Sequence, residues 1–576
     1  MKRNHIITLI ISFCAVSCGG LDPDDPFQWG FDPWGQGQGT GTTAEPLYSG
    51  ITGSKTFEIV KDEEDSIANT KFKRTIRITF SDSAGASVEG DKNGIVSIDG
   101  NKVTADNTGT TEKVQYELTG STSNGFFKIY SNNKQAIVLD GVSITNPAGA
   151  AINNQCKKRS FVVVNGTNKL NDGANYTQTP ENEDEKAAFF SEGQVIFSGD
   201  GTLEVNAVGK AGITSDDYLH FMGSPTISVK STVGHAIRGK DAVIVSDGTL
   251  NLEATANMKK GIASDSLVVF TGGKTTIKVS GGTAYDDEDK EYKAASGIKS
   301  DQFFVMAGGK LDITSTGQGA KGINTDKDAY FQGGELRIQV SGTKFNGTDT
   351  KSAKGIKVDG NIYISDGELI VTSANHEAVE AEGRVEITGG TLYAKAKDDA
   401  INSGGEMAIT GGRVCAWSTG NDGLDANGNL FLEGGILYAV GSRTPEVGVD
   451  ANTEKGFRLY VNGGTLFVIG GLENSSVLSQ ACYQANSWKA STWYALTVGE
   501  ETIAFKTPDS GSSGLVVSGS AQPTLSSGVS VSGGNSFFEG VAVSGGSVTG
   551  GSAVTLSAYS GGQGFPGGPG GGPGRP

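Results

Sequence analysis

The sequence predicts an all-β fold, a right-handed parallel β-helix with a strand-rich cap at each end. Three observations predict it: a motif that recurs at intervals of roughly 22 to 25 residues, paired glycines at a fixed place in that motif, and short alternating strands without a helical 3.6-residue stripe. Leucine-rich repeats have a similar period, but the Gly-rich corners and alternating runs favour a coil of three strands per turn.

The repeat combines a small residue, an Ile, a Ser-Asp-like turn, an apolar pair, Gly-Gly and an alternating strand. Clear copies of its first half are residues 210–216, 260–265, 296–301, 321–326 and 354–359. Equivalent Ile, Leu and Val residues should stack inside the coil, while parallel pairing at ~4.8 Å turns each outward position into a column of side chains.

Composition and repeats divide the chain into six parts. They are a signal peptide at 1–17, a flexible linker at 18–47, an N-terminal β cap at 48–110, a carbohydrate-binding parallel β-helix at 111–471, a C-terminal β cap at 472–560 and a disordered Gly/Pro tail at 561–576. Caps are expected because an open solenoid end exposes strand edges.

The N-terminal residues are predicted to form an export signal. Lys2 and Arg3 precede the apolar run 6–16, which is too short to span a bilayer, and residues 15–19 resemble the lipobox of bacterial lipoproteins. Cys18 is therefore the predicted lipidation site; an ordinary signal peptide with a chance cysteine is the alternative. The acidic residues at 22–25 resemble a surface-export signal, although solvated linker charge would look the same. We expect an outer-membrane lipoprotein exposed at the cell surface, which meets the membrane through its lipid anchor only.

Charge and cysteine content exclude several classes. A net charge of −17 opposes nucleic-acid binding. The three cysteines of the mature body, Cys156, Cys415 and Cys482, lack CxxC spacing and nearby histidines, so neither a disulfide framework nor a zinc site is expected.

Two acidic columns are predicted near the end of the β-helix. One aligns Glu377, Asp399 and Asp422, and the other aligns Glu380, Asn402, Asp425 and Asp450. Stacked carboxylates repel one another unless a cation lies among them, and Ca²⁺ accepts six to eight oxygens in flexible geometry. Calcium is the predicted ion; a solvated acidic face or turn-forming Asp and Asn residues are the alternatives.

The same two columns become basic or mixed in the middle coils. Their cations are Arg238, Lys260, Lys299, Lys321, Lys354 and Lys357. A line of cations could guide a linear polyanion, and an acidic polysaccharide suits this chain better than DNA. Scattered solvated lysines are the simpler interpretation. A further column, Asp265, Asp301, Asp326, Asp359 and Glu382, is assigned to turn formation at Gly-rich corners.

Five ordered segments carry a family resemblance: residues 116–120, 139–146, 149–152, 165–173 and 199–205. They resemble the carbohydrate-binding β-helix family of secreted bacterial proteins, which are similar to pectate lyases in fold. The resemblance implies binding of calcium and of polysaccharides such as polygalacturonate or cellulose, without established catalysis. The family often has Asp-Gly-Ile in successive coils, whereas this chain has Lys260, Ser296, Lys321 and Lys354 at the Asp position.

Loops and aromatic residues mark two candidate faces. Insertions at 171–185, 283–292 and 343–352 fall just before the columns, and insertions on one side of a solenoid often border a binding face. A second face carries Tyr393, Trp417, Tyr438 and Phe467 in consecutive coils. These rings could stack on sugars or be buried under residues 472–560.

Evidence for catalysis is weak. A uronate lyase would need a base, for which Lys397 beside Asp398 and Asp399 is the candidate and Lys395 a weaker one. Inverting hydrolysis by two carboxylates stays open. The leading prediction is non-catalytic, calcium-dependent binding of an acidic, pectin-like or possibly cellulose-like polysaccharide. The alternatives are a polysaccharide lyase and a structural adhesin or scaffold that binds other envelope proteins.

Overall fold

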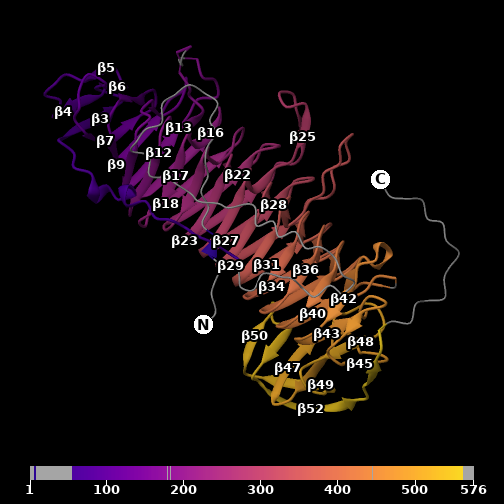
Figure 1. Ribbon diagram of the computed structural model, residues 1–576. Coiled ribbons are helices and arrows are strands. Elements are labelled where there is room, and N and C mark those ends of the chain that lie inside the picture. Colours follow the sequence, from indigo (N-terminus) through magenta and orange to yellow (C-terminus); the bar gives the residue numbers. More distant parts are fainter. Residues whose placement is uncertain (1–5, 8–54, 178–179, 182, 444, 562–576) are drawn as a thin grey trace, which may run out of the picture. The chain divides into compact units, whose positions relative to one another are not determined.

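The computed structural model describes residues 6–7, 55–177, 180–181, 183–443 and 445–561. The chain divides into two compact units, Met1–Ala353 (unit 1) and Lys354–Pro576 (unit 2). Figure 1 shows the strands of the described residues. The predicted linker with Cys18, and nearly all of the predicted signal segment and C-terminal tail, lie outside the described residues. Among the described residues no helix is long and apolar enough to cross a membrane. The helices are single 3-10 turns: η1, Glu63–Asp65; η2, Ile67–Asn69; and η3, Thr453–Lys455.

The coils of unit 1 place one strand each on three faces, and strands of successive coils pair in parallel. Face 1 consists of β6 (Lys102–Asn107), β8 (Phe126–Ser131), β10 (Ile152–Asn154), β13 (Ala187–Ser191), β16 (Ala211–Ser215), β19 (Ile237–Gly239), β22 (Lys260–Ser264), β26 (Ser296–Ser300) and β28 (Lys321–Thr325).

Faces 2 and 3 follow in each coil, and four long strands bend from one face to the other. Face 2 contains β11 (Ser160–Asn165), β14 (Val195–Gly199), β17 (Tyr218–Phe221) and β20 (Ala242–Val245). Face 3 contains β12 (Thr167–Asn171), β15 (Thr202–Ala207), β18 (Thr226–Ser231) and β21 (Thr249–Ala254). The strands that serve both faces are β9 (Gln135–Thr145), β23 (Leu267–Val279), β27 (Phe303–Ser315) and β29 (Ala329–Val340).

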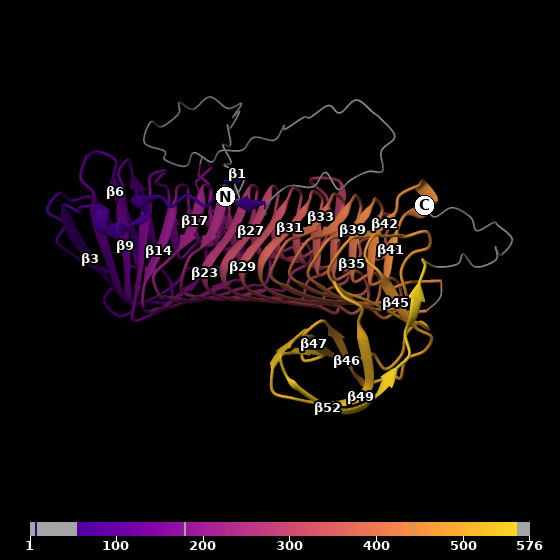
Figure 2. The same cartoon turned by 60° about the horizontal axis from the view of Figure 1, so that its bottom comes forward.

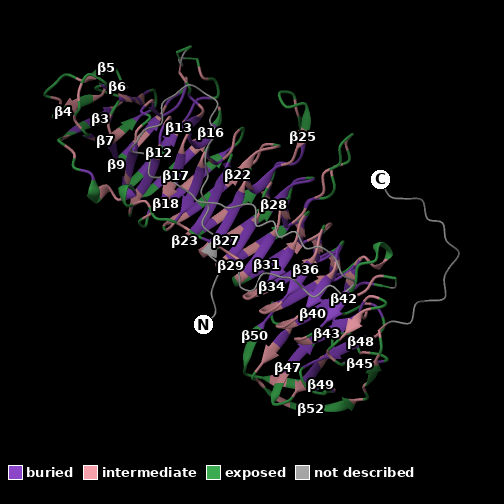
Figure 3. Ribbon diagram, in the orientation of Figure 1, coloured by how far each residue is buried: buried purple, intermediate pink, exposed green. Residues whose placement is uncertain are grey.

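The core of unit 1 is a stack of identical inward positions. On face 1, Ile213, Ile237, Ile262, Ile298 and Ile323 stand in register and are fully buried. Each aliphatic side chain therefore packs on its equivalent one coil away, and burial of such a side chain is worth roughly 1.5–3 kcal/mol. Figure 3 shows the buried residues running along the coil strands, with exposed residues mainly at the loops.

The predicted N-terminal cap consists of two different structures. Strands β3 (Arg74–Ser81), β4 (Ser87–Glu89), β5 (Val96–Asp99) and β7 (Val114–Thr122) close the first coils. Residues 55–72, in contrast, run outside face 2 as a strap. At one end the backbone N–H of Phe57 donates to Gln332 Oε1 at 2.8 Å. At the other, buried Asp65 accepts from the Tyr218 hydroxyl at 2.5 Å and pairs with His220 Nδ1 at 2.6 Å.

Unit 2 repeats the same coil. Its face 1 consists of β30 (Ile356–Val358), β32 (Val379–Ala381), β35 (Ile401–Ser403), β38 (Leu424–Ala426) and β41 (Val449–Ala451). Its face 2 consists of β33 (Val385–Ile387), β36 (Met407–Ile409), β39 (Leu430–Leu432), β42 (Leu459–Val461) and β44 (Val477–Leu478). Its face 3 consists of β34 (Thr391–Ala396), β37 (Arg413–Ser418), β40 (Ile436–Val440) and β43 (Thr465–Ile469), and β31 (Ile362–Ser373) serves faces 2 and 3. The predicted all-β parallel β-helix is thus confirmed within each unit.

The C-terminal segment adds antiparallel strands to unit 2. Strand β48 (Leu515–Ser518) pairs with β43 and β45 (Cys482–Ala485), and β45 also pairs with β53 (Ser557–Tyr559). A separate sheet has the order β50 (Asn535–Phe537), β51 (Ala542–Ser544), β47 (Glu501–Lys506), β46 (Trp493–Val498), β49 (Thr524–Ser532) and β52 (Ser547–Val554). Figure 2 shows this sheet as its own layer against the coils of unit 2.

This layer settles the alternative left open for the aromatic row on face 3. Tyr438 and Phe467 are fully buried, and Phe505 of β47 lies 4.6 Å from the Phe467 ring. The Tyr438 hydroxyl donates to the Lys506 carbonyl at 2.9 Å. Cys415 rather than Trp417 shares the register of these rings. The row is a packing surface for the C-terminal sheet, and it is closed to sugars. Cys156, Cys415 and Cys482 are free and buried.

Candidate metal and carbohydrate site

The outward position after each inward aliphatic residue of face 1 forms the acidic column of unit 2. Strand pairing aligns Glu380 with Asn402, Asn402 with Asp425 and Asp425 with Asp450, which is the alignment that the sequence predicts. The Asn402 amide donates to Asp425 Oδ2 at 2.7 Å. The four side chains therefore follow one another along face 1 at the spacing of neighbouring strands.

A second row lies two positions before the inward residue, at the corner that enters face 1. Its members Asp399 and Asp422 are only 6% and 8% exposed. The backbone N–H of Asp422 donates to Asp399 Oδ1 at 3.0 Å, and the N–H of Val447 donates to Asp422 Oδ1 at 2.5 Å. Backbone donors thus orient each carboxylate toward the next coil.

These buried carboxyl groups hold protons more tightly than ordinary aspartates. Burial, followed by the charge of Asp425, raises the pKa of Asp399 to about 8. Burial raises the pKa of Asp422 to about 9, with Asp450 and Asp399 adding to the shift. The pKa of Asp425 rises to about 6 through burial and the charge of Asp450. At the last coil, burial and a hydrogen bond with Asp450 raise the pKa of Glu473 to about 8.

The two predicted sets of site residues meet at the first coils of unit 2. Lys354 Nζ lies 2.5 Å from Glu380 Oε2 and 3.4 Å from Glu377 Oε2. Lys354, predicted to contact carbohydrate, therefore neutralises two of the predicted calcium ligands. Asp399, Asp422 and Asp425 form no ion pair with a described lysine, arginine or histidine.

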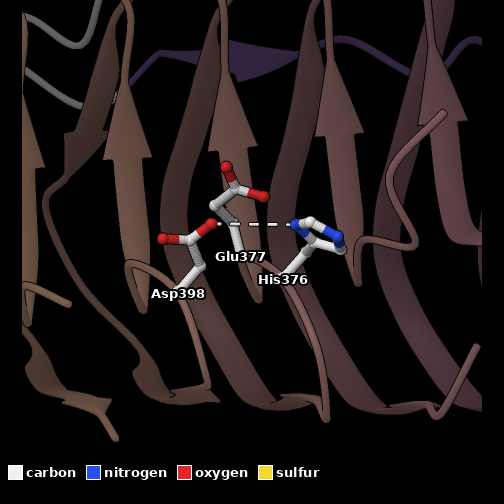
Figure 4. A group of neighbouring side chains, drawn as sticks. All are labelled: His376, Glu377 and Asp398. Carbon is white, nitrogen blue, oxygen red and sulfur yellow. Dashed lines mark ion pairs between the residues drawn. The ribbon is translucent and has the colours of Figure 1, made fainter. Parts of the chain in front are cut away.

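A third column, which the sequence-derived set omits, lies one residue further upstream. His376 Nδ1 is 3.7 Å from Asp398 Oδ2, and the Asn421 amide donates to Asp398 Oδ1 at 3.0 Å. The ligand atoms of His376, Glu377 and Asp398 lie within 4.8 Å of one another. Figure 4 shows these three side chains gathered together, with the ion pair between His376 and Asp398. The neighbouring His376 side chain lowers the pKa of Asp398. This column could have been found from the sequence, because His376, Asp398 and Asn421 immediately precede Glu377, Asp399 and Asp422.

In unit 1, two of the four predicted cations, Arg238 and Lys299, are paired with acids at the corner three positions after the inward residue. Arg238 Nη2 lies 2.7 Å from Asp265 Oδ2, and Lys299 Nζ lies 2.9 Å from Asp301 and 2.5 Å from Asp326. In unit 2, Lys357 contacts Asp359 at 2.8 Å and Glu382 at 2.5 Å. The corner acids, assigned to turns from the sequence, thus also compensate the cations.

The other two predicted cations are largely enclosed. Lys321 is 8% exposed, and its ammonium lies 3.4 Å from the Gly319 carbonyl. Lys260 donates to the Met258 carbonyl, and burial with the nearby Lys259 lowers the Lys260 pKa to about 7. These two side chains offer little charge to a polyanion outside the coil.

A shallow hollow on face 3 of unit 1 was not anticipated from the sequence. It encloses about 300 Å³ over β15, β18, β21 and β23. Its polar lining consists of Glu204, Asn206, Ser228, Lys230, Asn251, Glu253, Thr276 and Lys278. Amides, hydroxyls and charged groups at strand spacing are suited to hydrogen-bond sugar hydroxyls.

The candidate lyase bases differ in their surroundings. The Lys395 ammonium lies over the Trp417 ring, 5.0 Å from its centroid, and is held there as a cation–π contact. Lys397 is exposed at the corner beside Asp398 and Asp399.

Comparisons with known proteins give one structural match and one family match. A solved structure, the polysaccharide lyase-like protein from C. thermocellum in a gadolinium derivative, is 22% identical, covers 46% of this chain and 97% of that chain, and gives a TM-score of 0.36. No curated protein matches. The model of one family matches residues 99–265, 255–344 and 303–400, which together exceed half of the chain. On this match, the chain belongs to the family of carbohydrate-binding domain-containing proteins.

Proposed function

We propose that this protein binds an acidic, uronate-containing polysaccharide without cleaving it, through calcium held by the carboxylates of unit 2. The observation that carries the proposal is the trio Asp399, Asp422 and Asp425, of which the first two are buried and the third half-buried. The three lie in neighbouring coils and lack a basic partner among the described residues. Grouped carboxylates of this kind are costly when ionised, and a bound cation removes that cost.

Calcium suits the donor set better than other ions. The ligands would be carboxylate oxygens of Asp399, Asp422, Asp425 and Asp450, with the amide oxygen of Asn402. Ca²⁺ takes such oxygens in irregular geometry, whereas Mg²⁺ demands an octahedron. A calcium ion that keeps open positions can accept uronate carboxylates directly. His376 lies at the neighbouring group and would favour a borderline metal there.

The cations of unit 2 would contribute to polysaccharide binding directly and not through calcium. Lys357 is aligned with Glu380 and pairs with the exposed acids Asp359 and Glu382. Exposed ion pairs are worth little, so a uronate carboxylate can replace one partner without a large loss of free energy. We expect these residues to tune affinity and the calcium ligands to determine it.

The test is binding of the full chain to a glycan array with calcium and with a chelator, together with calorimetry of calcium. We expect polyuronates to bind only with calcium, and the double variant Asp399→Asn with Asp422→Asn to lose calcium binding and at least tenfold in polyuronate affinity. Asp301→Asn with Asp326→Asn in unit 1 is the matched control and should retain both. Chelator-insensitive binding, or no heat with calcium, would overturn the calcium site.

A lyase is the second candidate, favoured by the exposure of Lys397 beside Asp398 and Asp399. The same samples are assayed for unsaturated uronate products by ultraviolet absorbance. Product that appears with the native chain and disappears with Lys397→Ala would replace the binding proposal by a lyase.

We also propose that the protein acts at the cell surface, anchored through Cys18, which lies outside the described residues. The support is the lipobox-like stretch at residues 15–19 and the acidic residues that follow. Cys18→Ala should leave the membrane fraction or retain an uncleaved signal. Unchanged membrane association of the variant, measured by fractionation and detergent partitioning, would contradict lipidation.

A further inference from the structure

Two insertion loops of unit 1 carry an aromatic cluster outside the coils. One loop is the hairpin of β24 (Ala284–Asp286) and β25 (Glu291–Lys293), which projects from the coils in Figure 1. The other is closed by the antiparallel bridge between Phe345 and Lys351. Both loops were anticipated from the sequence as insertions, but without a role for their aromatic residues.

The rings form one row although they come from separate segments. Tyr285 and Tyr292 face each other across the hairpin, with centroids 5.2 Å apart. The Tyr292 ring is in turn 5.3 Å from the Phe345 ring of the second loop. The row therefore ties the two loops together and presents a shared aromatic surface.

This row remains accessible, unlike Tyr438 and Phe467 of the aromatic row on face 3 of unit 2. Tyr285 is 44% exposed, and Tyr292 and Phe345 are half-buried. Tyr438 and Phe467, in contrast, are fully covered by the C-terminal sheet. Large aromatic side chains left on projecting loops mark a binding surface more often than a packing surface.

The loops are also held in a defined shape. Lys293 Nζ lies 3.0 Å from Asp286 and contacts Asp289 across the hairpin tip. The backbone N–H of Phe345 donates to the Lys351 carbonyl at 2.9 Å, and the N–H of Lys351 returns to the Phe345 carbonyl at 3.2 Å. A preorganised aromatic surface loses little conformational entropy when it binds a ligand.

We propose that Tyr285, Tyr292 and Phe345 form a stacking platform for the pyranose rings of an uncharged polysaccharide. The C–H groups on one face of a pyranose pack against the negative face of an aromatic ring, while the sugar hydroxyls and the tyrosine hydroxyls keep their contact with water. The inference rests on carbohydrate binding as the function of this chain, and it does not need the calcium site.

The negative charge of the hairpin favours an uncharged polysaccharide over an acidic one. The hairpin carries five acids against two lysines: Asp286, Asp287, Glu288, Asp289 and Glu291 against Lys290 and Lys293. A polyuronate would approach this surface against like charge, whereas a neutral glycan meets no such penalty. Strand β23 supplies Thr276 and Lys278 to the polar hollow on face 3 shortly before it leads into this hairpin, so hydroxyl-binding groups lie on the same stretch of chain.

The experiment measures affinity of the full chain for soluble neutral β-glucan and xylan, and for polygalacturonate with calcium. Tyr285→Ala with Phe345→Ala should weaken neutral-glycan binding at least tenfold and leave calcium-dependent polyuronate binding within twofold. Tyr285→Trp should retain neutral binding, since it keeps a stacking surface. Phe457→Ala, an exposed aromatic of unit 2, is the matched control and should change nothing.

Unchanged melting and circular dichroism confirm that each variant is folded, which is expected because the substitutions lie on loops. In saturation-transfer NMR, a neutral oligosaccharide should receive the strongest transfer at its ring C–H protons with the native chain and lose it with the double variant. The platform is wrong if the native chain binds no neutral glycan, or if the double variant binds it as well as the native chain does. The polyuronate arm of the same assay reports on the calcium site separately.

Discussion

Equivalent outward positions carry balanced charge in the middle coils and unbalanced charge in the last ones. After the inward residues Ile237, Ile298 and Ile356 stand Arg238, Lys299 and Lys357, each paired with corner acids. After Val379, Ile401, Leu424 and Val449 stand Glu380, Asn402, Asp425 and Asp450. Within the described part of the chain, only Glu380 of these has a lysine partner.

The comparison shows how one backbone supports two kinds of surface. The inward aliphatic residues are buried alike in both sets of coils, so the packing that stabilises the coil is the same. The outward positions can therefore vary without loss of the fold. Where the charges at the outward positions are balanced, each exposed ion pair contributes about 0–1 kcal/mol to the stability of the fold. Where they are unbalanced, the half-buried outward carboxyl groups stand near the buried Asp399 and Asp422, and the group needs protons or a cation.

The largest effect that should separate the two regions is the response of stability to pH. Burial raises the pKa of Asp399 to about 8 and of Asp422 to about 9, whereas an unfolded Asp ionises near pH ~4. Between these values the folded chain holds protons that the unfolded chain releases, so the stability of calcium-free unit 2 should fall as pH rises. From pH 6 to 9 we expect a loss on the order of 3 kcal/mol or more, or roughly 6–12 °C in melting temperature.

Hydrogen exchange measured during thermal unfolding can follow the two regions separately. Peptides from residues 399–451 should show the pH-dependent loss, and peptides from residues 237–300 should show little. Calcium should remove the loss, since the bound ion replaces the protons. Asp399→Asn with Asp422→Asn should remove most of the pH dependence of melting of unit 2 over this range and leave the smaller share that Glu473 and Asp425 contribute. Equal pH dependence of both regions in the calcium-free chain would refute the proposed difference.

Local pattern was sufficient to predict the coil and its columns. The recurrence of one aliphatic residue per coil sets the register, so the alignment of Glu380, Asn402, Asp425 and Asp450 could be predicted from neighbouring residues alone. The same reasoning, moved one position upstream, would have given His376 and Asp398. The sequence does not single out that column, because Asp398 also stands next to the candidate base Lys397.

Contacts between distant segments could not be predicted in this way. Nothing in residues 55–72 indicates that Asp65 binds Tyr218 and His220, or that Phe57 binds Gln332, because each contact joins positions more than 150 residues apart. The covering of Tyr438 by Phe505 is of the same kind. The pairing of Lys299 with Asp326 depends on side-chain reach between coils, which the repeat does not specify.

A smaller effect should follow from giving one acidic coil the charge pattern of the middle coils. Asn402 lies between Glu380 and Asp425 in the same column as Lys357, and its amide now donates to Asp425. Asn402→Lys would place an ammonium beside Asp425. An opposite charge at such a distance lowers a carboxyl pKa by roughly 1–3 units, so calcium-free stability at pH 8 should rise by about 1–2 kcal/mol. Calcium affinity should fall at least tenfold because the ammonium occupies the position of the ion.

Calorimetry and melting curves measure both changes, and Asn402→Gln, which keeps the amide, is the control. If Asn402→Lys bound calcium as tightly as the native chain, the acidic column would be a solvated surface and the ion would have to lie elsewhere.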